Sequence, residues 1–348
     1  MSQLSTKTNV AATACQAGPP PAEEPVAVRE VGCSLCGRRN FETIANRDRR
    51  GQPLETVACC DCGLVCHASI PSRDDLDEYY RNLYRRDYHG RWASSDYRLV
   101  REWNRGWRLY RQLQPYLPKS GSVFEIGAGL GCNLKPFELS GYEAVGIEPG
   151  EEFARLARDE LRANVACLGW ESLVGGGRHD LVLLVHVLEH LRDPIGALRR
   201  AADLLQSTGV VYIEVPNLVA ARRLTERQFH AAHIFNFTPA TLDRACRLAG
   251  LELLTPVTPV HSRNLGVLAR RLNPRLKLDP VANDYPLIER MLRQRTGWPV
   301  WLQPSYVIDR LITVYRQLDE RFRARSLRRR IIALCAQHSP APASRHAA

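Results

Sequence analysis

From Ser120 onward, short apolar runs alternate along the chain with segments in which apolar residues recur every three or four positions. The runs have the length of buried strands and are bounded by Gly, Pro and Asp, whereas the intervening segments have helical spacing. Strands and helices in alternation predict a parallel sheet with helices on its faces. Seven strands are expected, in the segments SVFEI, YEAVGIE, VACL, DLVLLVHV, VVYIEV, LELLTPV and LGVLARR.

The pattern differs on both sides of this α/β segment. The amino-terminal residues are rich in Ala, Pro, Thr and Ser without periodicity, which is typical of disorder. A Cys-rich unit and an Arg-rich stretch with helical spacing follow, and a long basic amphipathic stretch lies near the carboxyl end. The expected regions are a disordered lead (1–28), a Cys-rich module (29–71), a helical connector (72–119), the α/β domain (120–271), a helical basic extension (272–337) and a disordered tail (338–348).

The net charge of +11 raises the question of a nucleic-acid partner. Only four of the 48 basic residues are lysine, so we attribute the excess to arginine-rich codon usage and disfavour nucleic acid as the partner. The basic carboxyl-terminal stretch could contact an anionic membrane surface peripherally, but packing of a solvated helix on the main domain is the commoner explanation.

The longest uncharged apolar stretch is far shorter than the roughly 20 residues that cross a bilayer. The first residues lack the charged start and apolar core of a signal peptide, and we therefore expect a cytoplasmic protein. Six of the eleven cysteines lie between Cys33 and Cys66. Clustered cysteines in a reducing compartment indicate a metal site.

Two Cys-x-x-Cys pairs, each followed by glycine, have the spacing of two knuckles that hold one Zn²⁺ tetrahedrally, as in a zinc ribbon. The predicted metal ligands are Cys33, Cys36, Cys59 and Cys62. Cys60, Cys66 and His67 lie close by and leave the ligand set open, since Cys62 and Cys66 could also pair.

A glycine-rich loop follows the first strand of the α/β segment, directly after Glu125 and Ile126. Its glycines, which let the backbone turn sharply and approach a ligand, are Gly127, Gly129 and Gly131. A dinucleotide fingerprint would place its last glycine at position 132, where this chain has Cys132, and this departure argues against NAD. Glu148 ends the second strand, where a carboxylate can bind both ribose hydroxyls of an adenosine.

The segments VFEIGAGLGCNLKPF, GYEAVGIEP, DLVLLVHVLEHLRDPIGAL and VVYIEVPN resemble the successive motifs of class I S-adenosylmethionine-dependent methyltransferases, from Ser120 to Arg271. The resemblance implies a Rossmann-like sheet of seven strands, mostly parallel with the last antiparallel, and S-adenosylmethionine as cofactor. It places Glu125 and the loop from Gly127 to Gly131 along the methionine part of the cofactor and Glu148 on the ribose.

The same resemblance places Trp170 or Glu171 beside the adenine. His186, at the end of the fourth strand, is a further candidate for binding the cofactor, near its methyl group. The Cys-rich module is similar to amino-terminal zinc-binding modules of bacterial methyltransferases, many of which act in sugar and cell-envelope pathways. This likeness implies a small-molecule or sugar acceptor.

Histidines are the candidates for removing a proton from the acceptor. If a helix begins just after the fourth strand, His186, Glu189 and His190 share one face of it. His233 lies in HIFNFTP, which resembles the acceptor-side loop of the family, and a near-neutral histidine there could take the proton. A metal held by this cluster is the less favoured alternative, because a histidine stands where the hard-ion pattern has its first carboxylate.

Two other functions compete with a small-molecule methyltransferase. The segment from His186 to His190 is similar to the Glu-x-x-Glu-His metal site of some RNA ribose methyltransferases, whereas the absence of an Asn-Pro-Pro-Tyr tetrapeptide disfavours methylation of base amines. The third function is a zinc-ribbon binding protein without catalysis, which the intact glycine loop and Glu148 disfavour.

Overall fold

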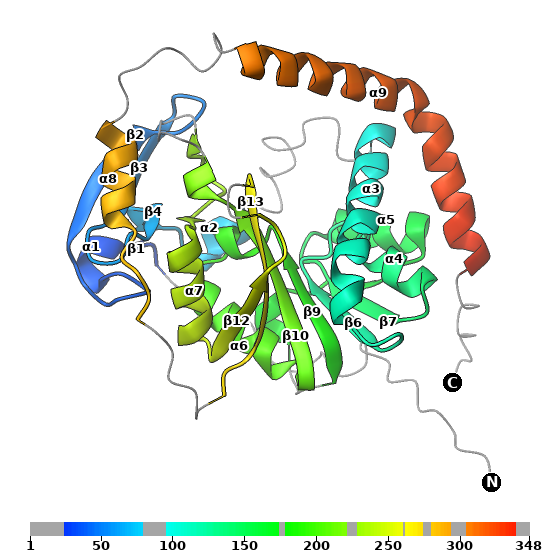
Figure 1. Cartoon of the computed structure of the whole chain (residues 1–348), viewed down its shortest axis with the longest axis horizontal. Coiled ribbons are helices and arrows are strands. Elements are labelled where there is room, and N and C mark those ends of the chain that lie inside the picture. The colour runs from blue at the N-terminus through cyan, green and yellow to red at the C-terminus, as the bar shows by residue number, and fades with distance from the viewer. Residues whose placement is uncertain are drawn as a thin grey trace.

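The computed structural model describes residues 24–78, 95–173, 178–220, 228–259, 262–273, 280–293 and 304–338. Residues 1–23 of the expected lead (1–28) and nearly all of the expected tail (338–348) lie outside these residues. At the centre is a seven-stranded sheet in the order β12-β13-β10-β9-β6-β7-β8 (Figure 1). Its strands are β6 (Ser122–Ile126), β7 (Glu143–Ile147), β8 (Asn164–Ala166), β9 (His179–Val185), β10 (Leu205–Pro216), β12 (Leu251–Pro256) and β13 (Asn264–Arg271).

The predicted sheet is confirmed in strand count and in direction. Strands β6 to β10 pair in parallel, whereas β13 runs antiparallel to β10, with Ile213 opposite Val267. Alternate residues of each strand enter opposite cores: Phe124 and Ile126 pack on one face of the sheet, and Val123 packs on the other. Burial on both faces explains why these strands are nearly continuous apolar runs.

Helices cover both faces of the sheet (Figure 1). One face packs against α3 (Asp96–Leu113), α4 (Leu134–Leu139) and α5 (Glu151–Leu161), and the other against α6 (Pro194–Asp203) and α7 (Pro239–Leu248). The starts of α6 and α7 follow from the sequence, since the Asp193 side chain accepts from the Gly196 N–H and Thr238 forms a capping box with Thr241. Both helices have proline in the first turn.

The Cys-rich module shares a sheet with the main domain. Strands β2 (Phe41–Arg47), β3 (Pro53–Cys59) and β4 (Val65–His67) form an antiparallel meander, and β11 (Phe235–Asn236) adds to β4 as a fourth strand. The sheet therefore crosses the boundary expected at residue 71. Short elements complete the module: β1 (Val26–Ala27), α1 (Val28–Val31), β5 (Ser69–Ile70) and α2 (Arg73–Glu78).

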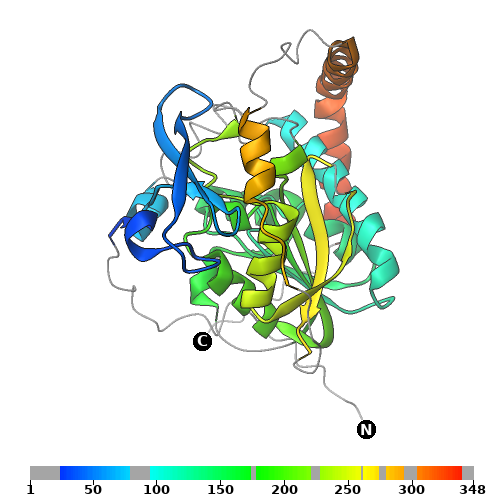
Figure 2. The ribbon, with the colours of Figure 1, turned by 60° about the vertical axis from the view of Figure 1, so that its left-hand side comes forward.

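Two helices form the described part of the carboxyl-terminal extension. Helix α8 (Tyr285–Arg293) lies beside the Cys-rich module, where Ile288 and Met291 are buried against it (Figure 2). Helix α9 (Pro304–His338) packs against α3 and α5, and Arg328 forms ion pairs there with Asp96 and Glu160 at 2.7 and 2.5 Å. In the part of the chain that the structure describes, no helix has the length and apolarity needed to span a membrane.

Candidate functional site

The glycine loop turns tightly at the carboxyl end of β6. Gly127, Gly129 and Gly131 have φ of 75°, 54° and 73°, in the left-handed region that favours glycine. A Cβ on Gly127 would lie 2.5 Å from Cγ2 of Val187, whereas a Cβ on Gly129 would meet nothing within 4 Å. The loop therefore packs closely at one glycine and is open at another, as a loop that cradles a ligand needs to be.

Glu148 directly follows β7 and is bound to the glycine loop. Its Oε2 accepts from the Gly129 N–H at 3.0 Å, and its Oε1 accepts from the Gly150 N–H at 2.9 Å. Burial raises the pKa of Glu148 above its ordinary value, although both backbone hydrogen bonds oppose this. The carboxyl is thereby fixed at the end of β7, where the sequence predicted a ribose-binding residue.

Glu125 is a buried carboxyl in the same place, with 1% of its surface exposed. Its Oε1 accepts from Nδ2 of Asn133 at 2.7 Å, whereas Oε2 has no hydrogen-bond partner within the described residues. Burial raises the pKa of Glu125 to about 8, with the nearby charge of Glu148 contributing. A buried oxygen without a partner, in an acidic cradle, fits a cationic ligand such as the ammonium group of S-adenosylmethionine.

Trp170 and Glu171 lie farther along the same edge of the sheet, in a short 3-10 helix (Trp170–Ser172) after β8. The Trp170 ring packs beside the start of α6, since a Cβ on Gly196 would lie 3.2 Å from Cη2 of the indole. Glu171 is half-exposed and lies 3.9 Å from Arg73. Their place beside an adenine stays a prediction.

His186 lies at the end of β9, next to the glycine loop by way of Val187. The helix expected to begin here does not: His186 has a left-handed φ of 56°, Leu188–His190 form one 3-10 turn, and α6 begins only at Pro194. The expected helix face is therefore wrong, because the chain must turn sharply to leave β9. A left-handed φ on histidine is uncommon, and such strained residues concentrate at functional sites.

Two carboxylates hold the His186 ring. Nδ1 lies 3.1 Å from Oε1 of Glu189, and Nε2 lies 3.2 Å from Oε1 of Glu214. Burial alone would lower the pKa of His186, but the hydrogen bonds to Glu189 and Glu214 raise it to about 9. Glu214 also binds Arg105 at 3.1 Å and Asn264 at 2.8 Å, so His186 lies within a charged network.

His190 and His233 lie on the other side of Glu189. Their ring centroids are 4.8 Å apart, and the ring of His230 lies 3.8 Å from that of His233. Nδ1 of His190 donates to the carbonyl of Ala232 at 2.7 Å, which ties the 3-10 turn to the segment before β11. Burial lowers the pKa of His190 and, more strongly, that of His233, where the neighbouring His190 and His230 add to the effect.

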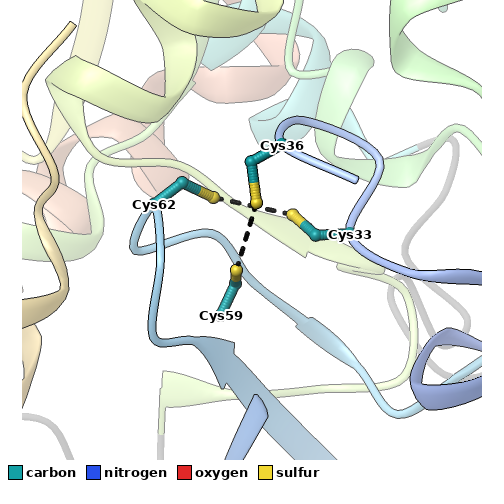
Figure 3. A group of neighbouring side chains, drawn as sticks. All are labelled: Cys33, Cys36, Cys59 and Cys62. Atoms are coloured by element: carbon teal, nitrogen blue, oxygen red, sulfur yellow. Dashed lines mark hydrogen bonds between the residues drawn. The ribbon is translucent and has the colours of Figure 1, made fainter. Parts of the chain in front are cut away.

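The four cysteines of the two Cys-x-x-Cys pairs come together as predicted (Figure 3). Sγ of Cys33 lies 3.5 Å from Sγ of Cys62, Sγ of Cys36 lies 3.5 Å from Sγ of Cys59, and all four sulfurs lie within 4.8 Å of one another. These separations fit four thiolates around one ion with metal–sulfur bonds of about 2.3 Å. The cluster could therefore bind a metal.

The neighbours that left the ligand set open are placed elsewhere. Cys66 is buried on β4 and is not among the four clustered sulfurs. His67 is buried, and its Nε2 lies 3.3 Å from the carbonyl of His230. The Cys60 carbonyl accepts from Nδ2 of Asn283 at 3.1 Å. Oδ1 of Asn283 in turn accepts from the backbone N–H of Tyr285.

Sequence reasoning missed several polar residues that hold the histidine cluster. Glu214 was assigned only to a strand, although a glutamate inside the apolar run VVYIEV is itself a signal, because a buried charge needs a partner. Asn264 and Arg105 gave no such signal, and His67 stood out only as a neighbour of the cysteines. They come from distant parts of the chain and meet Glu214 or His230 only in the fold.

Comparison with known proteins agrees with this geometry. Residues 87–255 match a family model described as a methyltransferase domain. The chain is 26% identical over 255 residues to the C-methyltransferase NovU of Streptomyces niveus, covering 70% of this chain and 56% of NovU. It is 30% identical over 100 residues to a ubiquinone biosynthesis O-methyltransferase of Rhodopseudomonas palustris, covering 27% of this chain and 40% of that protein.

The chain thus spans about half the length of these curated relatives. Among solved structures, it is similar to the CcbJ methyltransferase of Streptomyces caelestis, with 18% identity, a TM-score of 0.42 and coverage of 48% of this chain and 90% of that one. The family match includes the glycine loop, Glu148 and the histidine cluster. Just under half of the chain, residues 87–255, thus resembles a methyltransferase domain.

Proposed function

We propose that the protein transfers a methyl group from S-adenosylmethionine to a small-molecule acceptor, of the sugar or cell-envelope precursor class. The observation that carries the proposal is the acidic cradle formed by the glycine loop, the Glu148 carboxyl and the unpartnered Oε2 of Glu125. Glu125 would bind the ammonium group, Glu148 the ribose hydroxyls, and Trp170 or Glu171 would flank the adenine. The C- and O-methyltransferases among the relatives support a small acceptor.

When bound, S-adenosylmethionine supplies an electrophilic methyl group on a sulfonium sulfur. The chain has to hold the acceptor in line with the methyl–sulfur bond. It also has to take up any proton that the acceptor atom loses as the new bond forms. The close contact between Gly127 and Val187 supports a histidine cluster beside the loop that would bind the cofactor. We assign the acceptor side of the site to His186, His190 and His233.

We further propose that Cys33, Cys36, Cys59 and Cys62 hold one structural Zn²⁺, as in a zinc ribbon. Two glycines support the assignment, since Gly37 and Gly63, each following a Cys-x-x-Cys pair, have φ of 71° and 81°. The backbone amides of the same glycines donate to the carbonyls of Cys33 and Cys59, at 2.8 Å each. Such tight turns present two thiolates to one ion.

The test of the function has two parts. Calorimetry with S-adenosylmethionine measures binding, which we expect in the micromolar range by rough analogy with other cofactor sites. Methyl-labelled cofactor is then incubated with sugars, nucleotide-sugars, small metabolites and RNA in separate fractions. Label in a sugar or small-metabolite fraction supports the proposal, and label confined to RNA would replace it with ribose methylation.

A further inference from the structure

We propose that Glu189, His190 and His233 form a second metal site, for a divalent cation that imidazole and carboxylate ligands share, such as Zn²⁺, Fe²⁺ or Mn²⁺. One carboxylate oxygen and one ring nitrogen from each histidine lie within 4.8 Å of one another. The inference rests on the proposed function and deepens it, because it states how the acceptor side of that site is built.

The first support is the state of the Glu189 carboxylate. Glu189 is 1% exposed, and its Oε1 lies 3.1 Å from Nδ1 of His186. Its Oε2 has no hydrogen-bond partner among the described residues. A buried carboxylate oxygen without a partner is costly, and a bound cation would remove that cost.

The second support is the orientation of His190. Its Nδ1 donates to the Ala232 carbonyl at 2.7 Å, so Nε2 carries the ring's lone pair in the neutral tautomer. Nε2 lies 3.9 Å from Oε1 of Glu189, on the side of the cluster. Metal-binding histidines usually donate their second nitrogen to a carbonyl or carboxylate in this way, which fixes the tautomer and the ring orientation.

The third ligand, His233, is fixed by a separate part of the chain. Its backbone N–H donates to the His230 carbonyl at 3.0 Å. The carbonyl of the next residue, Ile234, accepts from the backbone N–H of His67 at 3.0 Å. The backbone that carries His233 is therefore held by β4 of the Cys-rich module. A ligand set supplied by the 3-10 turn and by this segment is preorganised before any ion binds.

His186 is not part of the ligand set, since both of its ring nitrogens face the carboxylates of Glu189 and Glu214. The sequence disfavoured a metal because His186 stands where the Glu-x-x-Glu-His pattern has its first carboxylate. That reason does not apply to a ligand set without His186. The proposed set is two histidines and one carboxylate, which leaves coordination positions open, as catalytic sites do. The four cysteines, by contrast, would fill all four coordination positions of a tetrahedral ion. An ion at Glu189 would anchor a hydroxyl, carbonyl or carboxylate oxygen of the acceptor beside the cofactor loop.

The test uses the full chain with its cysteine site filled with Zn²⁺, titrated with Co²⁺ as the probe. Visible absorption reports Co²⁺ at nitrogen and oxygen ligands, and the zinc and cobalt contents after gel filtration report any displacement from the cysteines. We expect one equivalent of Co²⁺ without loss of zinc. Glu189→Gln and His233→Gln should each weaken Co²⁺ binding by more than about tenfold. His230→Gln, which changes a ring packed on His233 but outside the ligand set, should bind Co²⁺ like the wild type.

Two results would overturn the metal site: a wild type that binds no Co²⁺ beyond the zinc displaced, or ligand variants that bind it as tightly as the wild type. Calorimetry with S-adenosylmethionine on the same preparations separates this failure from that of the function. Cofactor binding without Co²⁺ binding would leave the proposed function standing, with a histidine taking the acceptor's proton directly. A wild type that does not bind S-adenosylmethionine would overturn the proposed function itself.

Discussion

The backbone N–H of His67 donates to the carbonyl of Ile234 at 3.0 Å, one residue after His233. This bond and the pairing of β4 with β11 join the Cys-rich module to the segment that carries a candidate acceptor-side histidine. The strand β4 begins three residues after Cys62, so the order of the proposed zinc site and the order of this segment would be linked through one short stretch of backbone.

The first prediction concerns removal of the proposed zinc. Chelation, or Cys36→Ser, should increase hydrogen exchange at residues 229–237 as well as in β2 to β4, because structural zinc contributes directly to folding of its module. Exchange in β6 and β7 should stay unchanged. Cys167→Ser, at an exposed cysteine outside the cluster, is the matched control. Increased exchange confined to the module would contradict the link through β11.

The second prediction tests the cofactor cradle. Glu148→Ala should weaken S-adenosylmethionine binding by about 1 to 3 kcal/mol, because it would remove the proposed charge-assisted hydrogen bonds to the ribose. Calorimetry measures the change. Glu143→Ala, at the exposed start of the same strand, should bind the cofactor like the wild type. Equal affinity in all three proteins would remove Glu148 from the site.

The third prediction separates two glycines of one loop. A Cβ on Gly131 would lie 2.6 Å from Cβ of Ala163, so Gly131→Ala should lower the free energy of unfolding by more than about 2 kcal/mol. A Cβ on Gly129 meets no atom within 4 Å, so Gly129→Ala should cost only the left-handed strain of about 1 kcal/mol.

Gly129→Ala should cost little stability but should weaken cofactor binding, because its new methyl group would occupy space that the ligand needs. We expect at least tenfold weaker binding in this folded variant, measured by calorimetry beside urea unfolding. A Gly129→Ala protein with unchanged affinity would show that the ligand does not approach the loop at this residue.

The strands could be predicted because burial on both faces makes them continuous apolar runs, and the start of α6 because Asp193 and Pro194 act locally. The turn at His186 could not. Its helical spacing with Glu189 and His190 was real, but three residues of such a pattern do not distinguish a helix from a 3-10 turn after a buried strand. The sharp turn with which the chain leaves β9 determined the backbone here, and the helical spacing of the side chains did not.

Long-range pairing was the other limit. Nothing in the local sequence around Phe235 indicates that it will pair with Cys66, about 170 residues earlier in the chain. The Cys-x-x-Cys pairs, in contrast, carry their geometry locally in the glycines that follow them, and the sequence was sufficient to group those four cysteines.

The last prediction is a pH dependence that belongs to Glu125. Burial raises its pKa from 4.5 to about 8, so between these pH values the folded protein holds a proton that the unfolded chain has lost. Raising the pH through this window therefore favours the unfolded state. The contribution of Glu125 to the free energy of unfolding should fall by up to about 1.4 kcal/mol per pH unit and level off above the folded pKa.

Glu125→Gln keeps an oxygen that can accept from Asn133 and does not titrate, so it is the reference for this measurement. Urea unfolding of both proteins without cofactor, at several pH values between 5 and 8, gives the difference in free energy between them at each pH. That difference cancels the other titrating groups that the two proteins share, and it should shift steadily in favour of the variant as the pH rises. Parallel stability curves would mean that Glu125 is ionised in the folded protein, and the unpartnered Oε2 would then already carry the negative charge that a cationic ligand is expected to find.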